Sequence, residues 1–303
     1  MEFRKKIKIE DAGDQIDYQS RLMSVGSCFS DNIGSKLATN KFSILQNPQG
    51  VIFNPIALAN VFESFFPKEV FAKSNKTYSW MNHSSIMEEG EKLMVTRIRQ
   101  IKENTFSELA NASHVFVTFG SAWGYKHKDL NRVVANCHKM PQSDFSKELS
   151  SVEEIVNIWK DLITKYSHIN WIFTVSPVRH WKDGVRENNV SKGVLHQSIH
   201  QLLELENVNY FPAYELVMDE LRDYRFFKND MLHPNDLAVD YVWEKFSDAY
   251  FSDKTKLVVS EVEKLNRMQA HKVMKVGTEE SKLFVEEVEK QRAKVDKLIL
   301  FNQ

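Results

Sequence analysis

The sequence predicts an α/β fold built on a parallel sheet, and three short apolar runs are the main evidence. They read SRLMSVG at 20 to 26, ASHVFVTFG at 112 to 120 and NWIFTVSP at 170 to 177, and polar residues follow each of them. Continuous apolar runs of this length are typical of strands that are buried on both faces. Helical patterns fill the gaps between them, and strand followed by helix, repeated, favours a parallel sheet covered on both sides.

The remaining elements are expected from weaker patterns. Two more strands are expected at 51 to 53 and 207 to 211. Helices are expected at 31 to 40, 55 to 66, 151 to 167, 190 to 206 and 236 to 251. In parallel sheets, ligands bind beyond the carboxyl ends of the strands. The polar residues just past the expected strands are therefore candidates for a site: Ser27, Asn54, Ser121 and Ser176.

Two segments stand apart from this repeating pattern. Residues 67 to 111 are long for a crossover, and we expect an insertion over the strand ends that walls a pocket and includes a helix near 91 to 110. From 254 the chain is charged, helix-favouring and free of Pro, with Gly277 in its middle. This pattern predicts a helical hairpin over 254 to 303, whose apolar stripe packs on the main domain of residues 1 to 253 or forms a homo-oligomer.

The overall charge and the cysteines narrow the class of protein. The 303 residues include 40 basic and 41 acidic side chains, so no global field attracts nucleic acid or a membrane surface. A small-molecule substrate is the expected partner. Cys28 and Cys137 are too few and too distant for a disulfide framework, and neither has zinc-ligand spacing. The N-terminus lacks the apolar stretch of a signal peptide, so a cytoplasmic protein is expected.

Two separate motifs offer the parts of a nucleophilic site. Gly26, Ser27 and Cys28 stand where a strand end meets a helix start, and either the hydroxyl or the thiol could be a nucleophile. Asp230 and His233 are three residues apart, so a carboxylate can hold one imidazole nitrogen while the other faces a substrate. Ser27 is the first choice of nucleophile, with His233 as base. The alternatives are a serine that caps the helix and a Cys-His pair using the same histidine.

The stretch GSCFS at 26 to 30 resembles the signature of the GSCFA family, and its place after the first strand, with the late Asp-x-x-His, resembles the SGNH/GDSL hydrolases. Further stretches that resemble GSCFA proteins are VIFNP, TFGSAWGY, VANCHKMP, TVSPVRHWKDG and DMLHPN, within residues 20 to 250. The resemblance implies a flavodoxin-like three-layer α/β/α fold. It also implies an esterase or acyltransferase that acts on an ester of a carbohydrate or small molecule and uses Ser27, His233 and Asp230 without metal or cofactor.

The chain departs from the SGNH pattern at two places. The first block of those enzymes is Gly-Asp-Ser, whereas here Gly26 is followed directly by Ser27. Their third block is Gly-x-Asn, but Gly120 and Ser121 are followed by Ala122, so the usual oxyanion-binding amide is missing. We expect the Ser27 N–H and the Asn54 amide to bind the oxyanion instead. The alternative function is an inactive SGNH-like domain that binds a glycan or acyl ligand.

Several residues near the expected strand ends are candidates for binding substrate. Trp123 can stack on a sugar ring, and Arg179 and His180 can bind a carboxylate or phosphate. His138 follows Cys137, but adjacent residues point to opposite sides of an extended chain, so lining a pocket is expected for them and not a metal site. His83 is included because GSCFA proteins resemble this chain there.

Overall fold

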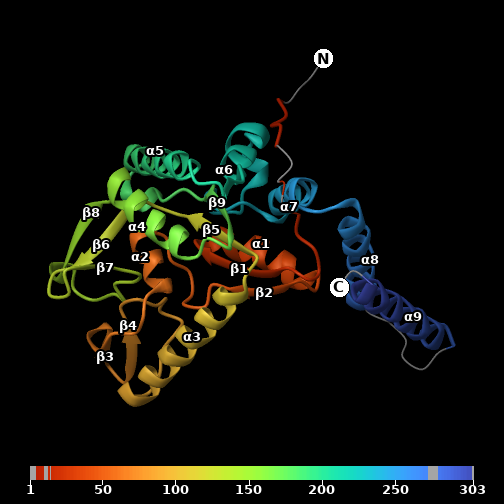
Figure 1. The fold of residues 1–303 in the computed structure, drawn as a ribbon, viewed down its shortest axis with the longest axis horizontal. Coiled ribbons are helices and arrows are strands. Elements are labelled where there is room, and N and C mark those ends of the chain that lie inside the picture. Colours follow the sequence, from red (N-terminus) through yellow and green to blue (C-terminus); the bar gives the residue numbers. More distant parts are fainter. Residues whose placement is uncertain (1–4, 10–12, 14, 272–278, 302–303) are drawn as a thin grey trace.

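A five-stranded parallel sheet forms the centre of the molecule in a computed structural model, which describes residues 5–9, 13, 15–271 and 279–301. In spatial order its strands are β2 (Ser43–Gln46), β1 (Arg21–Gly26), β5 (His114–Phe119), β9 (Asn170–Val175) and β10 (Val208–Tyr210). Counting only these strands, the order is the 2-1-3-4-5 of flavodoxin-like folds. The predicted parallel α/β fold is confirmed (Figure 1).

Alternate strand residues build two cores, one on each face of the sheet. Met23 and Val25 of β1 face a core with α2 (Pro55–Ala59), α3 (Glu91–Asn111), α4 (Val152–Lys165) and α5 (Val185–Leu202). Leu22, Phe116 and Ile172 face the opposite core, which includes α1 (Cys28–Thr39), α6 (Ala213–Glu215) and α7 (Asp236–Tyr250). Side chains alternate across a strand, so a mostly apolar, buried run such as LMSV contributes to both cores, and the fold has three layers.

One predicted strand is wrong in position. The second strand of the sheet is β2 at 43–46, which pairs with β1, whereas residues 51 to 53 belong to no strand. The Asn47–Gly50 turn separates the two segments, and Gly50 has a φ of 77°. After the turn the chain crosses the carboxyl ends of two strands, where Ile52 N–H donates to Gly26 O and Phe53 O accepts from Gly120 N–H. An apolar VIF therefore lies over the strand ends.

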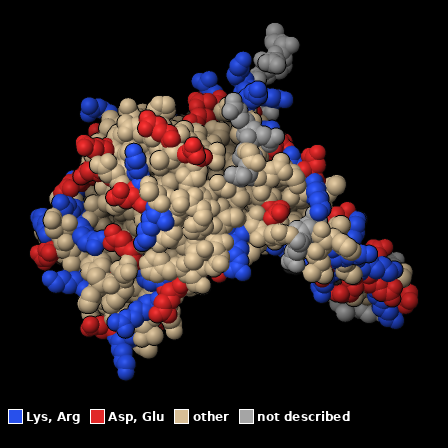
Figure 2. All heavy atoms as spheres, viewed as in Figure 1, with Lys and Arg blue, Asp and Glu red and all other residues tan. Residues whose placement is uncertain are grey.

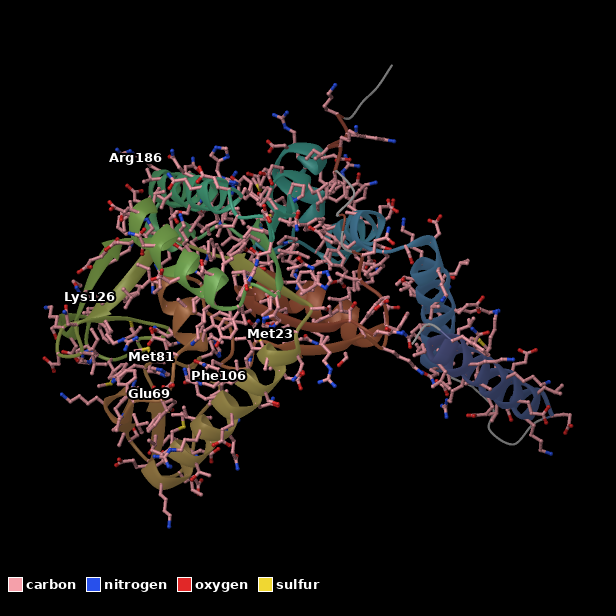
Figure 3. All side chains as sticks on the ribbon, viewed as in Figure 1. Met23, Glu69, Met81, Phe106, Lys126 and Arg186 are labelled. Carbon is pink, nitrogen blue, oxygen red and sulfur yellow. The ribbon has the colours of Figure 1, made fainter. Side chains whose placement is uncertain are left out.

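A second, antiparallel sheet was not predicted. It contains β6 (Trp123–His127), β7 (Arg132–Val134) and β8 (Phe145–Leu149) in the order β7-β6-β8. The hairpin of β3 (Val70–Lys73) and β4 (Lys76–Ser79) packs near it through Trp80, whose ring joins a cluster with Val134 and Phe145. Figure 3 labels Glu69 and Met81 in this part of the molecule.

Residues 67 to 111 combine this hairpin with a crossover helix. Helix α3 packs against β1, β3 and β4, and it connects the outer strand β2 to β5. Its buried Met94, Ile98 and Leu109 lie along one face, with successive spacings of four and eleven residues. The helix near 91 to 110 is therefore present as expected, and it covers a face of the central sheet.

The C-terminal helices form the expected hairpin within the described segments. Helix α8 (Asp253–Ala270) and α9 (Glu279–Phe301) pack together, while Gly277 lies outside the described residues. The α8 residues Val258, Val262 and Leu265 are buried in the same core as α7. Figure 1 shows the hairpin projecting from the α/β body on the side away from β6 to β8, and Figure 2 shows acidic and basic side chains mixed over it. A homo-oligomer through these helices stays a prediction.

None of the helices in the described ranges combines the length and the apolar character needed to cross a membrane.

Candidate functional site

The turn between β1 and α1 requires a glycine. Gly26 has a φ of 136°, and a Cβ atom there would lie 2.2 Å from Thr118 O of the neighbouring strand. Its N–H donates to Asn47 Oδ1 at 2.8 Å. A side chain at this position would therefore meet backbone as well as an unfavourable φ. Glycine lets β1 end against β5 and turn at once into α1.

Ser27 is the last residue of the turn before the helix, and it is wholly buried. Its side chain is 0 % exposed, and its hydroxyl has no hydrogen-bond partner among the described residues. Its N–H donates to Thr118 O at 3.0 Å, which continues the pairing of β1 with β5. The side chain does not cap α1, so the capping alternative is wrong.

Cys28 is the first residue of α1 and is partly exposed. Burial raises the pKa of its thiol most, and Asp31 raises it further, while its own N–H, the charge of Lys192 and the Phe29 N–H lower it. The first backbone N–H groups of a helix have no partner within the helix. Two of them, the N–H groups of Cys28 and Phe29, lower the pKa of the thiol, but burial and Asp31 outweigh them and the pKa is raised overall.

Asp230 and His233 form a carboxylate–imidazole pair on an exposed loop. Asp230 Oδ2 lies 2.7 Å from His233 Nδ1, while Oδ1 accepts the N–H groups of Leu232 and His233 at 2.9 and 3.0 Å. Those backbone bonds first, and the imidazole next, lower the pKa of Asp230 to about 2. The two side chains are 46 and 43 % exposed. No hydrogen bond in the described structure joins this imidazole to Ser27 or Cys28.

His180 lies on the loop after β9, and its pKa is shifted downwards. Burial lowers its pKa to about 4, and the charges of Lys192 and His233 lower it as well, against Asp183. Its ring meets Phe53 edge to face at 5.1 Å, and its Nε2 is buried without a partner among the described atoms. A neutral imidazole with an unsatisfied nitrogen therefore stands near the ends of β5 and β9.

Five of the predicted binding residues line one cavity of about 720 Å³. They are Asn54, Ser121, Trp123, His138 and His180. Arg179 lines a separate cavity of about 220 Å³ together with Met231 from the Asp230–His233 loop. The wall of the larger cavity comes mainly from the strands of the second sheet and the 135 to 142 loop between β7 and β8, and the 178 to 183 loop adds His180, Lys182 and Asp183. Among its described lining residues none belongs to 67 to 111. The expectation that this insertion walls the pocket is therefore wrong for this cavity.

The expected oxyanion donors are already engaged. Asn54 Nδ2 donates to Ala122 O at 3.1 Å and to Ser150 Oγ at 3.0 Å, while its Oδ1 caps α2. The Ser27 N–H, the other expected donor, donates to Thr118 O at 3.0 Å. The nearby N–H groups of Gly120 and Ser121 both donate to Phe53 O. An oxyanion bound by these groups would have to displace one of these bonds.

The other two predicted histidines have local partners. His138 Nε2 donates to Ser79 O at 2.8 Å, and burial lowers its pKa to about 4. His83 Nδ1 bonds Ser85 Oγ at 2.9 Å, and its Cβ stands over Gly50. His138 thus ties the cavity wall to the β3–β4 hairpin, and His83 packs on the turn before residue 51.

A set of polar residues on α5 was missed by the sequence reasoning. Asn188 Oδ1 accepts the His180 N–H, Ser191 Oγ accepts the Ala122 N–H at 2.7 Å, and Lys192 Nζ donates to Gly120 O and Ser176 O. All three side chains are buried. The helix was expected from 190, but it begins at Val185, beside the Arg186 that Figure 3 labels. The spacing of Asn188, Ser191 and Lys192 places these polar side chains on one face of a helix, and this pattern could have indicated that they face the strand ends.

In the described segments no three His, Cys, Asp or Glu side chains are grouped so as to hold a metal ion.

Solved structures with a distant similarity to this chain include two at 10 % sequence identity. A protein described as a candidate platelet activating factor from Streptococcus pneumonia has a TM-score of 0.36, with 77 % of this chain and 84 % of that one covered. An acetyl xylan esterase from the rumen bacterium Butyrivibrio proteoclasticus has a TM-score of 0.39, with 76 and 63 % covered. No curated protein matches the chain. The family model of the GSCFA family matches residues 21–246, so the chain belongs to the GSCFA family.

Proposed function

We propose that this protein hydrolyses or transfers an ester through an acyl-enzyme on Cys28, with His233 as general base and Asp230 as its orienting partner. The contrast between two adjacent residues carries the proposal: Cys28 is partly exposed, whereas Ser27 is 0 % exposed. A nucleophile must reach the substrate carbonyl, and backbone N–H groups must face the negative charge that develops. Both conditions favour Cys28 over Ser27, the nucleophile first expected from the sequence.

The reaction follows from these assignments. The Cys28 sulfur attacks the ester carbonyl carbon while its proton passes to His233 Nε2, and Asp230 stabilises the imidazolium through Nδ1. The oxyanion accepts the N–H groups of Cys28 and Phe29. The intermediate then releases the alcohol, which takes the proton from His233, and leaves a thioester. Water or an acceptor hydroxyl attacks the thioester with His233 again as base, which restores the thiol. Because burial raises the pKa of Cys28, the thiol needs this base.

The larger cavity supports a ring-bearing alcohol or sugar as the second half of the ester. Its volume of about 720 Å³ is that of a small-ligand site, and Trp123, Tyr125 and Phe145 contribute aromatic surface. Lys147 Nζ stands 4.8 Å from the Trp123 ring centroid and also pairs with Asp183. Aromatic faces with polar groups at their edges suit the alternating apolar and hydroxyl faces of a carbohydrate.

The test uses acyl-enzyme trapping with p-nitrophenyl acetate, read by intact mass. We expect an acetyl adduct on wild type and Ser27→Ala, none on Cys28→Ala, and much slower formation on His233→Gln. A thioester is cleaved by neutral hydroxylamine, whereas an oxygen ester resists it, so hydroxylamine identifies the atom independently of the variants. An adduct that survives in Cys28→Ala but disappears in Ser27→Ala would return the nucleophile to Ser27.

A second candidate, a non-catalytic domain that binds a glycan or acyl ligand, is favoured by one observation. The Asn54 amide and the N–H groups of Gly120 and Ser121 are engaged within the protein. Acetylated oligosaccharide bound equally by wild type and Cys28→Ala, with no adduct and no turnover, would support this candidate against the acyl-enzyme.

A further inference from the structure

One turn in the wall of the larger cavity has a backbone conformation that its residues do not favour. The Met140 N–H donates to Cys137 O at 2.9 Å, and the two residues between them, His138 and Lys139, have φ values of 48° and 56°. Positive φ at both central positions is typical of a type I′ turn, where glycine, asparagine and aspartate are the usual residues. Among the described residues, no other two adjacent non-glycine residues both have a positive φ. Left-handed backbone costs free energy at such residues, so other contacts must hold this turn.

The β3–β4 hairpin supplies those contacts. Lys73, the half-buried last residue of β3, donates from Nζ to His138 O and, at 3.0 Å, to Lys139 O. Ser79, the last residue of β4, accepts at its carbonyl from His138 Nε2 at 2.8 Å. The His138 ring also lies with its centroid 5.0 to 5.9 Å from three rings of this segment: Phe71, Tyr78 and Trp80. One lysine therefore holds both strained residues by their carbonyls, and the hairpin holds one of them by its side chain as well.

The turn lines the larger cavity, whereas the hairpin that holds it does not. All of residues 136 to 140 are among the lining residues, and none of the described lining residues belongs to 67 to 111. Residues in strained backbone conformations persist where the surrounding structure over-determines them, and they cluster at ligand sites. The hairpin therefore sets the shape of this wall from behind, without reaching the contents of the cavity.

We propose that residues 136 to 140 are a specificity loop for the alcohol half of the ester, and that Lys73 is the positioning residue that holds this loop in shape. The role in specificity rests on the proposed function, but the control of the turn by Lys73 does not. If the hairpin only stabilised the second sheet, loss of Lys73 would lower stability without changing which ester is preferred.

The first measurement uses Cys137 as a reporter of the turn. Cys137 is partly exposed and lines the cavity, and the tryptic peptides 133–139 and 22–36 separate it from Cys28. In Lys73→Met we expect iodoacetamide to alkylate Cys137 about tenfold faster, because the open turn becomes more populated when two bonds from a charged donor are lost. The rate at Cys28 should not change. Lys76→Met is the matched control, because Lys76 begins β4 of the same hairpin but pairs with Glu89.

Glycine at the second strained position separates control of the turn from general stability. Because glycine adopts a positive φ readily, Lys139→Gly should make the turn independent of the lysine bridge. In the double variant Lys73→Met with Lys139→Gly, the Cys137 rate should return to within about twofold of wild type. A wild-type rate in Lys73→Met, or a raised rate that Lys139→Gly does not lower, would overturn the proposal.

Specificity is read from two acetate esters that differ only in the alcohol, ethyl acetate and methyl 6-O-acetylglucopyranoside. In Lys73→Met we expect KM for the sugar ester to rise about tenfold with little change in kcat, because binding of the alcohol half is lost. The kinetics with ethyl acetate should not change. An equal loss with both esters, or no loss with either, would overturn the role in specificity. If wild type hydrolyses neither ester, the proposed function is refuted, whereas faster Cys137 alkylation in Lys73→Met would still support the control of the turn.

Discussion

The two halves of the proposed catalytic apparatus are held in opposite ways. The Gly26–Cys28 turn is fixed by the central sheet, through bonds from Gly26 and Ser27 to distant parts of the chain. The Asp230–His233 loop is exposed, and Asp230 is held by N–H groups two and three residues away. The nucleophile is therefore preorganised by long-range packing, whereas the base is organised by its own turn. Substitutions in the turn should cost stability, and substitutions in the loop should cost activity alone.

The loop side of the comparison predicts the largest effect. His233→Gln and Asp230→Asn should lower the rate of ester hydrolysis about 10²- to 10⁴-fold, because each removes part of the general base. Their free energies of unfolding should stay within about 0.5 kcal/mol of wild type, since both side chains are exposed. Steady-state kinetics and urea unfolding measure the two quantities.

Asp17→Asn is the matched control for the loop, because Asp17 also accepts N–H groups two and three residues away but lies at the other end of β1. It should leave hydrolysis unchanged. If His233→Gln instead lowers the free energy of unfolding by several kcal/mol, the loop is packed as part of the core. The distinction between a turn held by the sheet and a loop held by its own bonds would then be wrong.

The turn side predicts a loss of stability. Gly26→Ala places a Cβ atom 2.2 Å from Thr118 O at a φ of 136°, so strain and overlap should together lower the free energy of unfolding by at least about 3 kcal/mol. Gly193→Ala is the control: its Cβ would meet nothing within 4 Å, and alanine in a helix should stabilise by about 0.5–1 kcal/mol. A Gly26→Ala protein as stable as wild type would show that the turn can relax.

The parallel sheet and the contact between Asp230 and His233 could be predicted from the sequence because both depend on local pattern. LMSV and HVFVTF are mostly apolar and buried on both faces, and a separation of three residues closes a turn. The position of β2 was missed because the polar SILQ is an edge strand, paired on one side only. Which of Ser27 and Cys28 reaches the surface depends on the direction in which α1 leaves the sheet. The α5 contacts join residues about 70 positions apart, such as Ser191 and Ala122, so no local pattern reveals them.

Asn54 tests whether a residue that supports the site also takes part in the reaction. Asn54→Ala removes the α2 cap and two buried bonds, so the free energy of unfolding should fall by about 2–3 kcal/mol. Asn54→Asp keeps the oxygen that caps α2 but cannot donate to Ala122 O and Ser150 Oγ. It therefore separates the contribution of the cap from that of the two donated bonds. Once corrected for the folded fraction, kcat should be unchanged, since both amide hydrogens are used within the protein. A further 100- to 1000-fold loss would establish Asn54 as an oxyanion donor.

The smallest effect concerns acid, and it again separates buried groups from exposed ones. Burial lowers the pKa of His138 from 6.5 to about 4, so between these values the unfolded chain binds a proton that the native protein does not. Stability is therefore lost as the pH falls from about 6.5 through about 4, by at most about 2 kcal/mol at pH 5. His138→Gln can still donate to Ser79 O but cannot be protonated, so its urea-unfolding free energy should fall less steeply over that range. If the unfolding free energies of wild type and His138→Gln fall equally with pH, His138 can be protonated in the native protein, and this part of the cavity wall is less tightly packed than its burial indicates.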